Sequence, residues 1–289
     1  MRHAYCIEAH NDFSILEKIF RLLDDEKNDF YIHVDKKSKI DKRYFENILK
    51  KSTVKWVKRH VVSWGGYSQI RAELKMFANA YEVGYDYYHL ISGVDMPIKS
   101  LEFINDFFER NKGFEFITCD VGCDYMKNSG LDERFKYYWF WRDVRLPSLI
   151  KGILETKTYQ LQKKLRVDRY REKYEYGYGA NWCSLTHKAI QKIMEQKKWI
   201  RETYRFTSCC DEIYKQTILH KAGLPLYPKG DLRFIIFEPG KNGPITYSMA
   251  DYNMLMESDK LWARKFSTQI DKQVIEKIYE TLIGENDAG

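Results

Sequence analysis

The first half of the chain alternates short apolar runs with longer segments of helical periodicity, and this alternation restricts its fold more than any other feature. The apolar runs are rich in β-branched or aromatic residues, which is typical of buried strands. The segments between them carry apolar residues three and four apart, as one face of a helix does. This order predicts an α/β fold, with a mostly parallel sheet covered by helices on both faces. The expected strands are 4–9, 30–35, 54–57, 87–92 and 114–119, and the expected helices are 13–23, 44–51, 67–82 and 101–111.

The alternation stops at residues 120–175, which are basic and aromatic, with helical periodicity in LPSLIKGILETKTYQLQKKL. We interpret this segment as a helical insertion on the acceptor or membrane side of a single domain that spans residues 1–289. Beyond it, the glycine-containing stretch YGYGANWCSL suits a strand or loop close to a ligand. We also expect a helix capped by Thr186, a helix that begins near Ser208, a strand at 232–238 and helices near 248–257 and 271–283.

Polar residues follow three of the predicted strands. His10 lies in the turn after the first strand, Asp35 ends the second, and Asp95 follows the fourth. Each alone is ordinary turn chemistry. In open parallel sheets, however, ligands bind beyond the carboxyl ends of the strands. Three such turns on one edge favour a nucleotide pocket.

Several common motifs are absent from the sequence. There is no G-x-x-x-x-G-K-[ST], no glycine in the turn EAHND after the first strand, no G-x-S-x-G and no H-E-x-x-H. P-loop enzymes, dinucleotide-binding enzymes, α/β-hydrolases and HExxH metalloproteases are therefore disfavoured. The six cysteines include no C-x-x-C pair, which favours reduced thiols over a zinc site.

Charge and hydropathy indicate the kind of partner and the cellular location of this chain. The formal net charge of +7, from 48 basic and 41 acidic residues, favours an anionic partner. We see neither a secretory signal nor a run of about 20 apolar residues that could span a membrane. We therefore expect a cytoplasmic protein, with peripheral contact at the inner face of the plasma membrane.

Six motifs in a fixed order carry a resemblance to a known family. They are AYCIEAHND…FYIHVDKKS, VSWGGYSQIRAEL, YYHLISGVDMPIKS, YGYGANWCSLTHKAI, SCCDEIYKQTIL and LWARKFS. Together they resemble the core-2/I-branching β-1,6-N-acetylglucosaminyltransferase family, which also includes xylosyltransferases, in a short, bacterial-looking form. The resemblance runs through residues 4–266 and is weakest at 120–175. It implies a GT-A-like (Rossmann-like) fold, a UDP-sugar donor as co-substrate, inversion at the anomeric carbon and no divalent metal or other cofactor.

The resemblance also implies how the leaving group is stabilised. The departing UDP develops negative charge and needs an electrostatic partner. Metal-dependent relatives of the fold use an Asp-x-Asp motif to hold an ion, and this chain has none. Family motifs place an arginine and a lysine in that role, at Arg233 and Lys265, with Arg264 as a substitute.

The remaining donor and sugar contacts follow from the same motifs. Ala9 and His10 are expected beside the nucleoside, and Asp35 near the uracil, whose N–H a carboxylate can accept. Asp95 is expected at the ribose or the sugar. Tyr178 and Trp182 could stack on a sugar face, although a core position suits Trp182 as well.

Asp211 and Glu212 stand together at the start of a predicted helix. An inverting transferase needs one carboxylate to deprotonate the acceptor hydroxyl, and the resemblance assigns that role to Glu212. The alternative is a helix cap, since Ser208 and Asp211 have the spacing of a capping box. Both readings can hold, because adjacent helix residues point about 100° apart. Asp211 could then serve the cap, or lie on the acceptor side, while Glu212 faces the cleft.

Several alternatives remain open at this stage. The expected donor is UDP-GlcNAc, but UDP-galactose, UDP-glucose and UDP-xylose also fit the family. The expected acceptor is a saccharide or lipid-linked saccharide of bacterial surface polysaccharide synthesis. A non-enzymatic RNA- or membrane-binding module is the other class, supported by the basic aromatic insertion. The sequence contains no nucleic-acid-binding motif, so no nucleic-acid partner is expected.

Overall fold

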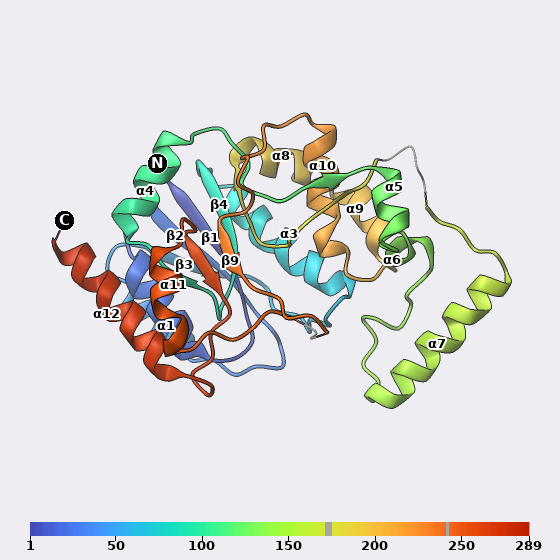
Figure 1. Cartoon of the computed structure of the whole chain (residues 1–289), viewed down its shortest axis with the longest axis horizontal. Coiled ribbons are helices and arrows are strands. Elements are labelled where there is room, and N and C mark those ends of the chain that lie inside the picture. The colour runs from blue at the N-terminus through green and yellow to red at the C-terminus, as the bar shows by residue number, and fades with distance from the viewer. Residues whose placement is uncertain (171–174, 241–242, 289) are drawn as a thin grey trace.

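A five-stranded sheet forms the centre of the molecule in the computed structural model, which describes residues 1–170, 175–240 and 243–288 (Figure 1). The strand order is β3-β2-β1-β4-β8. The first four strands pair in parallel, and β8 runs antiparallel to β4. The predicted α/β fold with a mostly parallel sheet is thus confirmed. The strands are β1 (His3–Ala9), β2 (Asn28–Val34), β3 (Thr53–Trp56), β4 (Tyr87–Ser92) and β8 (Cys183–Thr186).

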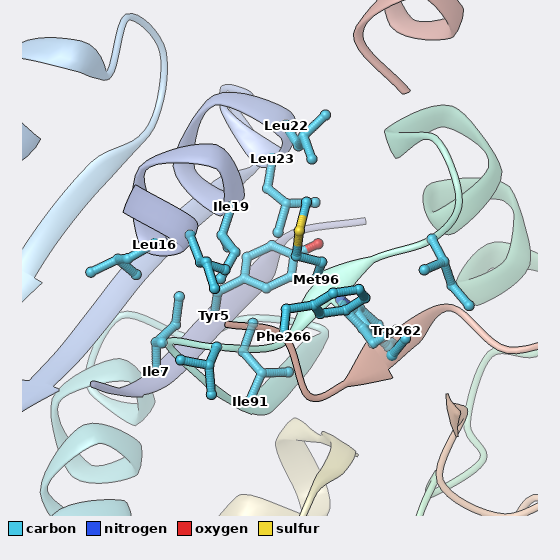
Figure 2. Close-up of a cluster of buried hydrophobic side chains, with 14 of the residues drawn as sticks. Tyr5, Ile7, Leu16, Ile19, Leu22, Leu23, Ile91, Met96, Trp262 and Phe266 are labelled. Atoms are coloured by element: carbon cyan, nitrogen blue, oxygen red, sulfur yellow. The ribbon is translucent and has the colours of Figure 1, made fainter. Parts of the chain in front are cut away.

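Helices cover both faces of this sheet, because successive side chains of a strand point to opposite sides. On β1, Tyr5 and Ile7 pack into one apolar core and Ala4 and Cys6 into the other. Figure 2 shows the first core, where side chains of α1 meet those of the sheet and Trp262. This core involves α1 (Phe13–Leu23), α2 (Lys42–Ile48), α4 (Leu101–Arg110), α11 (Tyr252–Glu257) and α12 (Lys272–Ala288); the other involves α3 (Tyr67–Tyr81), α8 (His187–Glu195), α9 (Lys197–Tyr204) and α10 (Tyr214–Lys221).

A small three-stranded sheet brings a C-terminal segment beside the end of β4. Strand β10 (Trp262–Arg264) pairs antiparallel with β5 (Met96–Pro97) and parallel with β9 (Arg233–Ile235). Because β5 follows the turn after β4, this pairing places Arg264 next to that turn. The apolar residues of 232–238 thus form a shorter strand than predicted, outside the main sheet.

The described part of the insertion consists mainly of helices and loops, as predicted, with one two-residue strand. It contains α5 (Cys123–Asn128), α6 (Glu133–Lys136) and α7 (Ser148–Lys164), and the two-residue strand β6 (Asp120–Val121) pairs with β7 (Gly177–Tyr178). Helix α7 projects from the side of the molecule in Figure 1. Among the described residues, no helix combines the length and apolar character needed to cross a bilayer.

Two sequence-based assignments were wrong. Segment 114–119 is not a regular strand, because only Glu115 and Phe116 form isolated bridges, to Leu226 and Ser184. The fifth strand of the sheet is β8 instead. The helix expected near Ser208 begins only at Tyr214, after a 3-10 turn over Cys210–Glu212. The cap at Thr186 is confirmed, since its hydroxyl accepts the Ala189 N–H at 3.2 Å.

Candidate functional site

A pocket of about 280 Å³ opens beyond the carboxyl ends of β1, β2 and β4. The chain order reverses between β1 and β4, because β2 and β3 extend the sheet on one side of β1 and β4 on the other. Such a reversal is where open α/β sheets bind ligands. We call this cavity the switch-point pocket. It is lined by Glu8, Ala9, His10, His33, Asp35, Lys37, Val62, Trp64, Gln69, Ser92, Trp182 and Arg264.

Asp35 is fixed at one wall of the pocket. Its backbone N–H donates to the Ala9 carbonyl at 2.9 Å. Its carboxylate accepts the N–H groups of Lys37 at 2.8 Å and Val62 at 3.2 Å. Burial lowers the pKa of nearby His10, so this imidazole is neutral near pH 7. The pocket therefore brings together Ala9, His10 and Asp35, the three residues expected around the nucleoside.

Arg264 supplies a positive charge to the pocket. Its guanidinium donates to Asp95 at 2.7 Å and to the Ser92 hydroxyl. It also lies over the Trp182 ring at 4.4 Å, a cation–π contact. Both hydrogen bonds use Nη1, and within the described residues neither Nε nor Nη2 forms a hydrogen bond to the protein. The N–H groups of Nε and Nη2 therefore allow Arg264 to bind an anion.

Asp95 affects the pocket indirectly, through its hydrogen bond with Arg264. It is fully buried, and its carboxylate accepts the Ser92 N–H at 2.7 Å, the Ser92 hydroxyl at 2.6 Å and the Arg264 guanidinium. Asp95 does not line the pocket. In this structure Asp95 orients Arg264. The direct contact with ribose or sugar that the sequence predicted would require Asp95 to line the pocket.

The other two predicted cations do not line the pocket. The buried guanidinium of Arg233 donates to the carbonyls of Leu90 at 3.2 Å and Cys183 at 2.6 Å, and stacks on Trp262. Arg233 thus joins β4 to β8, and the expectation that it faces a diphosphate is not met in this arrangement. Lys265 is half-buried beside Arg264.

Glu212 ends the 3-10 turn that precedes α10. Cys209 begins this turn with a φ of 50°, and no side chain caps it. The capping box that the sequence suggested for Ser208 and Asp211 therefore does not form. The Cys209 N–H donates to the Gly65 carbonyl at 2.9 Å. Since Gly65 follows Trp64 of the pocket wall, the Glu212 turn abuts that wall.

An arginine from the insertion holds the Glu212 carboxylate. Arg134 of α6 contacts it at 2.6 Å and also donates to the Cys209 carbonyl at 3.1 Å. The guanidinium carbon of Arg134 lies 5.4 Å from the centre of the Tyr178 ring. The Glu212 side chain is 33% exposed, so it can meet a ligand from solvent. Tyr178 and Glu212 are thus both contacted by Arg134, which the sequence did not single out.

Asp211 turns into the protein. Burial raises its pKa to about 7, with further contributions from Glu73 and Glu212. The Lys215 ammonium contacts Glu73 at 2.6 Å and the Asp211 carbonyl at 3.0 Å, and also reaches the Asn181 side chain. Asp211 therefore belongs to a buried polar cluster behind the pocket and is not on the acceptor side.

Sequence reasoning did not single out several residues of the site, among them Glu8 and Trp64 of the pocket wall and Arg134 beside Glu212. Glu8 had a detectable signal in the sequence, since it is an acidic residue inside an apolar strand. In the folded protein, burial raises the pKa of Glu8 well above its usual value. Arg134 could not be recognised in this way, because its contact with Glu212 joins segments far apart in the sequence.

The sequence is similar to a family of known proteins. The Core-2/I-Branching enzyme family model matches residues 3–254. The chain is thus a mixed α/β protein that belongs to the core-2/I-branching family of glycosyltransferases.

Curated relatives include xylosyltransferase 2 of Canis lupus familiaris, 28% identical over 241 residues, and of Mus musculus, 28% identical over 244 residues. Each alignment covers 77% of this chain and 25% of the relative, so the chain spans about a quarter of their length. A solved structure assigned as a glucose-1-phosphate thymidylyltransferase of Bacillus anthracis shares 14% identity over 78% of this chain and 85% of that chain. Its TM-score against this chain is 0.36.

Proposed function

We propose that this protein transfers a sugar from a UDP-sugar to a saccharide hydroxyl with inversion and without a metal ion, in bacterial surface polysaccharide synthesis. UDP-GlcNAc is the first donor to test. The observation that carries the proposal is the placement of Glu212, partly exposed, on a turn that abuts a pocket containing the cation Arg264. A base and an anion-binding group are the two elements that an inverting transfer requires.

The donor would lie across the switch-point pocket. The uracil end fits beside Asp35 and His10, where a fixed carboxylate can accept a ring N–H. The diphosphate fits beside Arg264, whose position is set by Asp95 and Trp182. A planar guanidinium suits phosphate oxygens because it offers paired donors. Arg264 thereby takes the role that the sequence had given first to Arg233 and Lys265.

The transfer itself needs one proton acceptor and one leaving-group partner. Glu212 removes the proton from the acceptor hydroxyl as that oxygen forms a bond to the anomeric carbon. The bond from the anomeric carbon to the UDP oxygen breaks on the opposite face, and its electrons leave with UDP. Arg264 stabilises the resulting diphosphate charge. Arg134 keeps the Glu212 carboxylate oriented until the acceptor arrives.

The metal-free part of the proposal rests on this fixed cation and on the missing Asp-x-Asp motif. Among residues 1–170, 175–240 and 243–288, no group of three His, Cys, Asp or Glu side chains is arranged to hold an ion. The need for a metal is decided by assay with and without chelator.

UDP-xylose is the second candidate donor. It is favoured by the similarity to proteins named xylosyltransferase 2. The pocket residues are compatible with either donor, since Asp35 and Arg264 would contact the nucleotide and not the sugar. A donor panel that also contains UDP-galactose and UDP-glucose separates these options.

The test is UDP release from each donor by wild type and Glu212→Gln, with EDTA or manganese added. We expect Glu212→Gln to lower kcat by roughly 100-fold or more, because the amide cannot accept the proton, while donor binding is retained. Glu202→Gln on the exposed side of α9 is the matched control and should keep full activity. Normal turnover by Glu212→Gln would refute the assignment of the base. Activity lost in EDTA and restored by manganese would refute the metal-free mechanism.

A further inference from the structure

Helix α7 presents an apolar face that packs on nothing in the described structure. The helix projects from the body of the molecule (Figure 1). Its inner side carries Gln162, which contacts the backbone of Tyr138, and Tyr159, which contacts Glu133. Its outer side carries large apolar side chains that are 47–75% exposed. These are Leu149, Ile150, Ile153 and Leu161.

The charges around this face are nearly all positive. Residues 144–166 contain six basic residues and one acidic residue, Glu155. Glu155 is not on the outer face, because it pairs with Arg142 at 3.5 Å. Lys157 and Lys164 are exposed, and no carboxylate of the described residues forms an ion pair with either. The outer face of α7 therefore combines leucine, isoleucine and lysine without a negative charge.

A second copy of the chain is a poor match for this face. A helix of 17 residues is about 25 Å long, so one side of it offers on the order of 250 Å². A stable protein interface needs about 800 Å² from each partner. Two such faces would also bring like-charged lysines together. A lipid surface has neither restriction, because it adapts to a narrow apolar face and supplies negative charge.

We propose that α7 lies flat on an anionic lipid membrane, with Leu149, Ile150 and Ile153 in the interfacial layer and Lys157 and Lys164 at the headgroups. The exposure of these apolar side chains, the one-sided charge and the absence of a spanning helix in the described residues all fit a helix that lies in the interface. This binding is a property of the insertion and goes beyond the proposed transfer reaction.

The contacts of α7 lead directly to the catalytic side of the molecule. Tyr159 of α7 donates to Glu133 of α6 at 2.8 Å. The next residue of α6, Arg134, holds Glu212. A membrane bound by the outer face of α7 would therefore be connected to Glu212 through the contacts of the inner face of the same helix.

The experiment is flotation of the purified protein with vesicles. One set contains phosphatidylglycerol with phosphatidylcholine, and the other contains phosphatidylcholine alone. We expect wild type to float with the anionic vesicles only, and to dissociate as salt is raised. Leu149→Ser/Ile150→Ser/Ile153→Ser should weaken this binding about tenfold or more, because three side chains leave the interface. Lys157→Glu/Lys164→Glu should weaken it comparably.

The matched controls change exposed residues elsewhere. Val83→Ser/Ile270→Ser removes two exposed apolar side chains, and Lys198→Glu reverses an exposed charge. Both should float like wild type. UDP release with a soluble acceptor, or UDP-dependent thermal stabilisation if no acceptor is found, shows that each variant is folded. No flotation of wild type, equal flotation with neutral vesicles, or equal loss in the controls would overturn the proposal. So would a wild-type dimer in light scattering that the triple serine variant converts to monomer, because a second copy would then cover α7.

Discussion

At the scale of single residues, two adjacent carboxylates have opposite environments. Glu212 is partly exposed and paired with Arg134, whereas Asp211 is buried beside Lys215 and Glu73. The sequence predicted that the two side chains diverge, because they are neighbours in a helical turn. It could not predict the partners, since Arg134 and Glu73 lie far from them in the chain. The role of each carboxylate is therefore set by tertiary contacts.

The buried position of Asp211 predicts a pH-dependent stability. Its pKa is about 7 in the folded protein and about 3.9 in an unfolded chain. Between these values the folded state binds more protons, so the free energy of unfolding falls as pH rises through this window. Asp211→Asn removes the effect. We expect its stability relative to wild type to be roughly 2–3 kcal/mol greater at pH 8 than at pH 5, measured by urea unfolding.

The exposed Asp259 provides the comparison for this measurement. Its pKa is lowered by the hydrogen bond from Lys229, so Asp259→Asn should not gain relative stability as pH rises. An Asp211→Asn variant whose difference from wild type is the same at both pH values would show that Asp211 is ionised throughout.

At the scale of elements, local pattern predicted the strands of the sheet but not how every segment joins it. Strands β1 to β4 each contain enough apolar residues to be predicted from the sequence. Segment 114–119 is equally apolar, yet only Phe116 forms a backbone bridge to β8, at Ser184, whereas the Glu115 carboxylate accepts hydrogen bonds from Thr186 at the end of that strand. In the same way, motifs predicted which residues lie near the pocket, but Arg233 and Asp95 were turned inward by hydrogen bonds that no motif records.

The glycines of YGYGA lie where other parts of the backbone approach closely. A Cβ atom on Gly179 would lie 2.0 Å from the Thr118 carbonyl oxygen. We expect Gly179→Ala to destabilise the protein by about 1–3 kcal/mol in urea unfolding. It should also reduce turnover, because the Gly179 N–H donates to the Glu212 carbonyl at 3.0 Å.

Gly152 in α7 is the matched site for this change. A Cβ atom there meets no atom within 4 Å, so Gly152→Ala should stabilise the helix by about 0.5–1 kcal/mol. Equal effects of the two alanines would mean that the close contact at Gly179 is relaxed in solution.

At the scale of the whole molecule, the two apolar cores share one sheet. The same strands contribute alternate side chains to both, so loss of one core exposes the strands that support the other. This sharing predicts that residues 1–289 unfold as one unit, in keeping with a single domain. The switch-point pocket is built from β1, β2, β4 and β10 together. A ligand bound there should accordingly stabilise the entire fold and not one part of it.

Calorimetry with and without UDP tests this coupling. UDP at 100 times its Kd should add about 2.7 kcal/mol to the free energy of unfolding and raise a single transition by roughly 5 °C. Arg264→Ala should lose most of this shift, because it removes the cation that we place beside the diphosphate, whereas Glu212→Gln should keep it, because the proposed base contacts only the acceptor. Two separate transitions, with only one moved by UDP, would show that the cores unfold independently. A shift that requires manganese would show that an ion binds the diphosphate in place of Arg264.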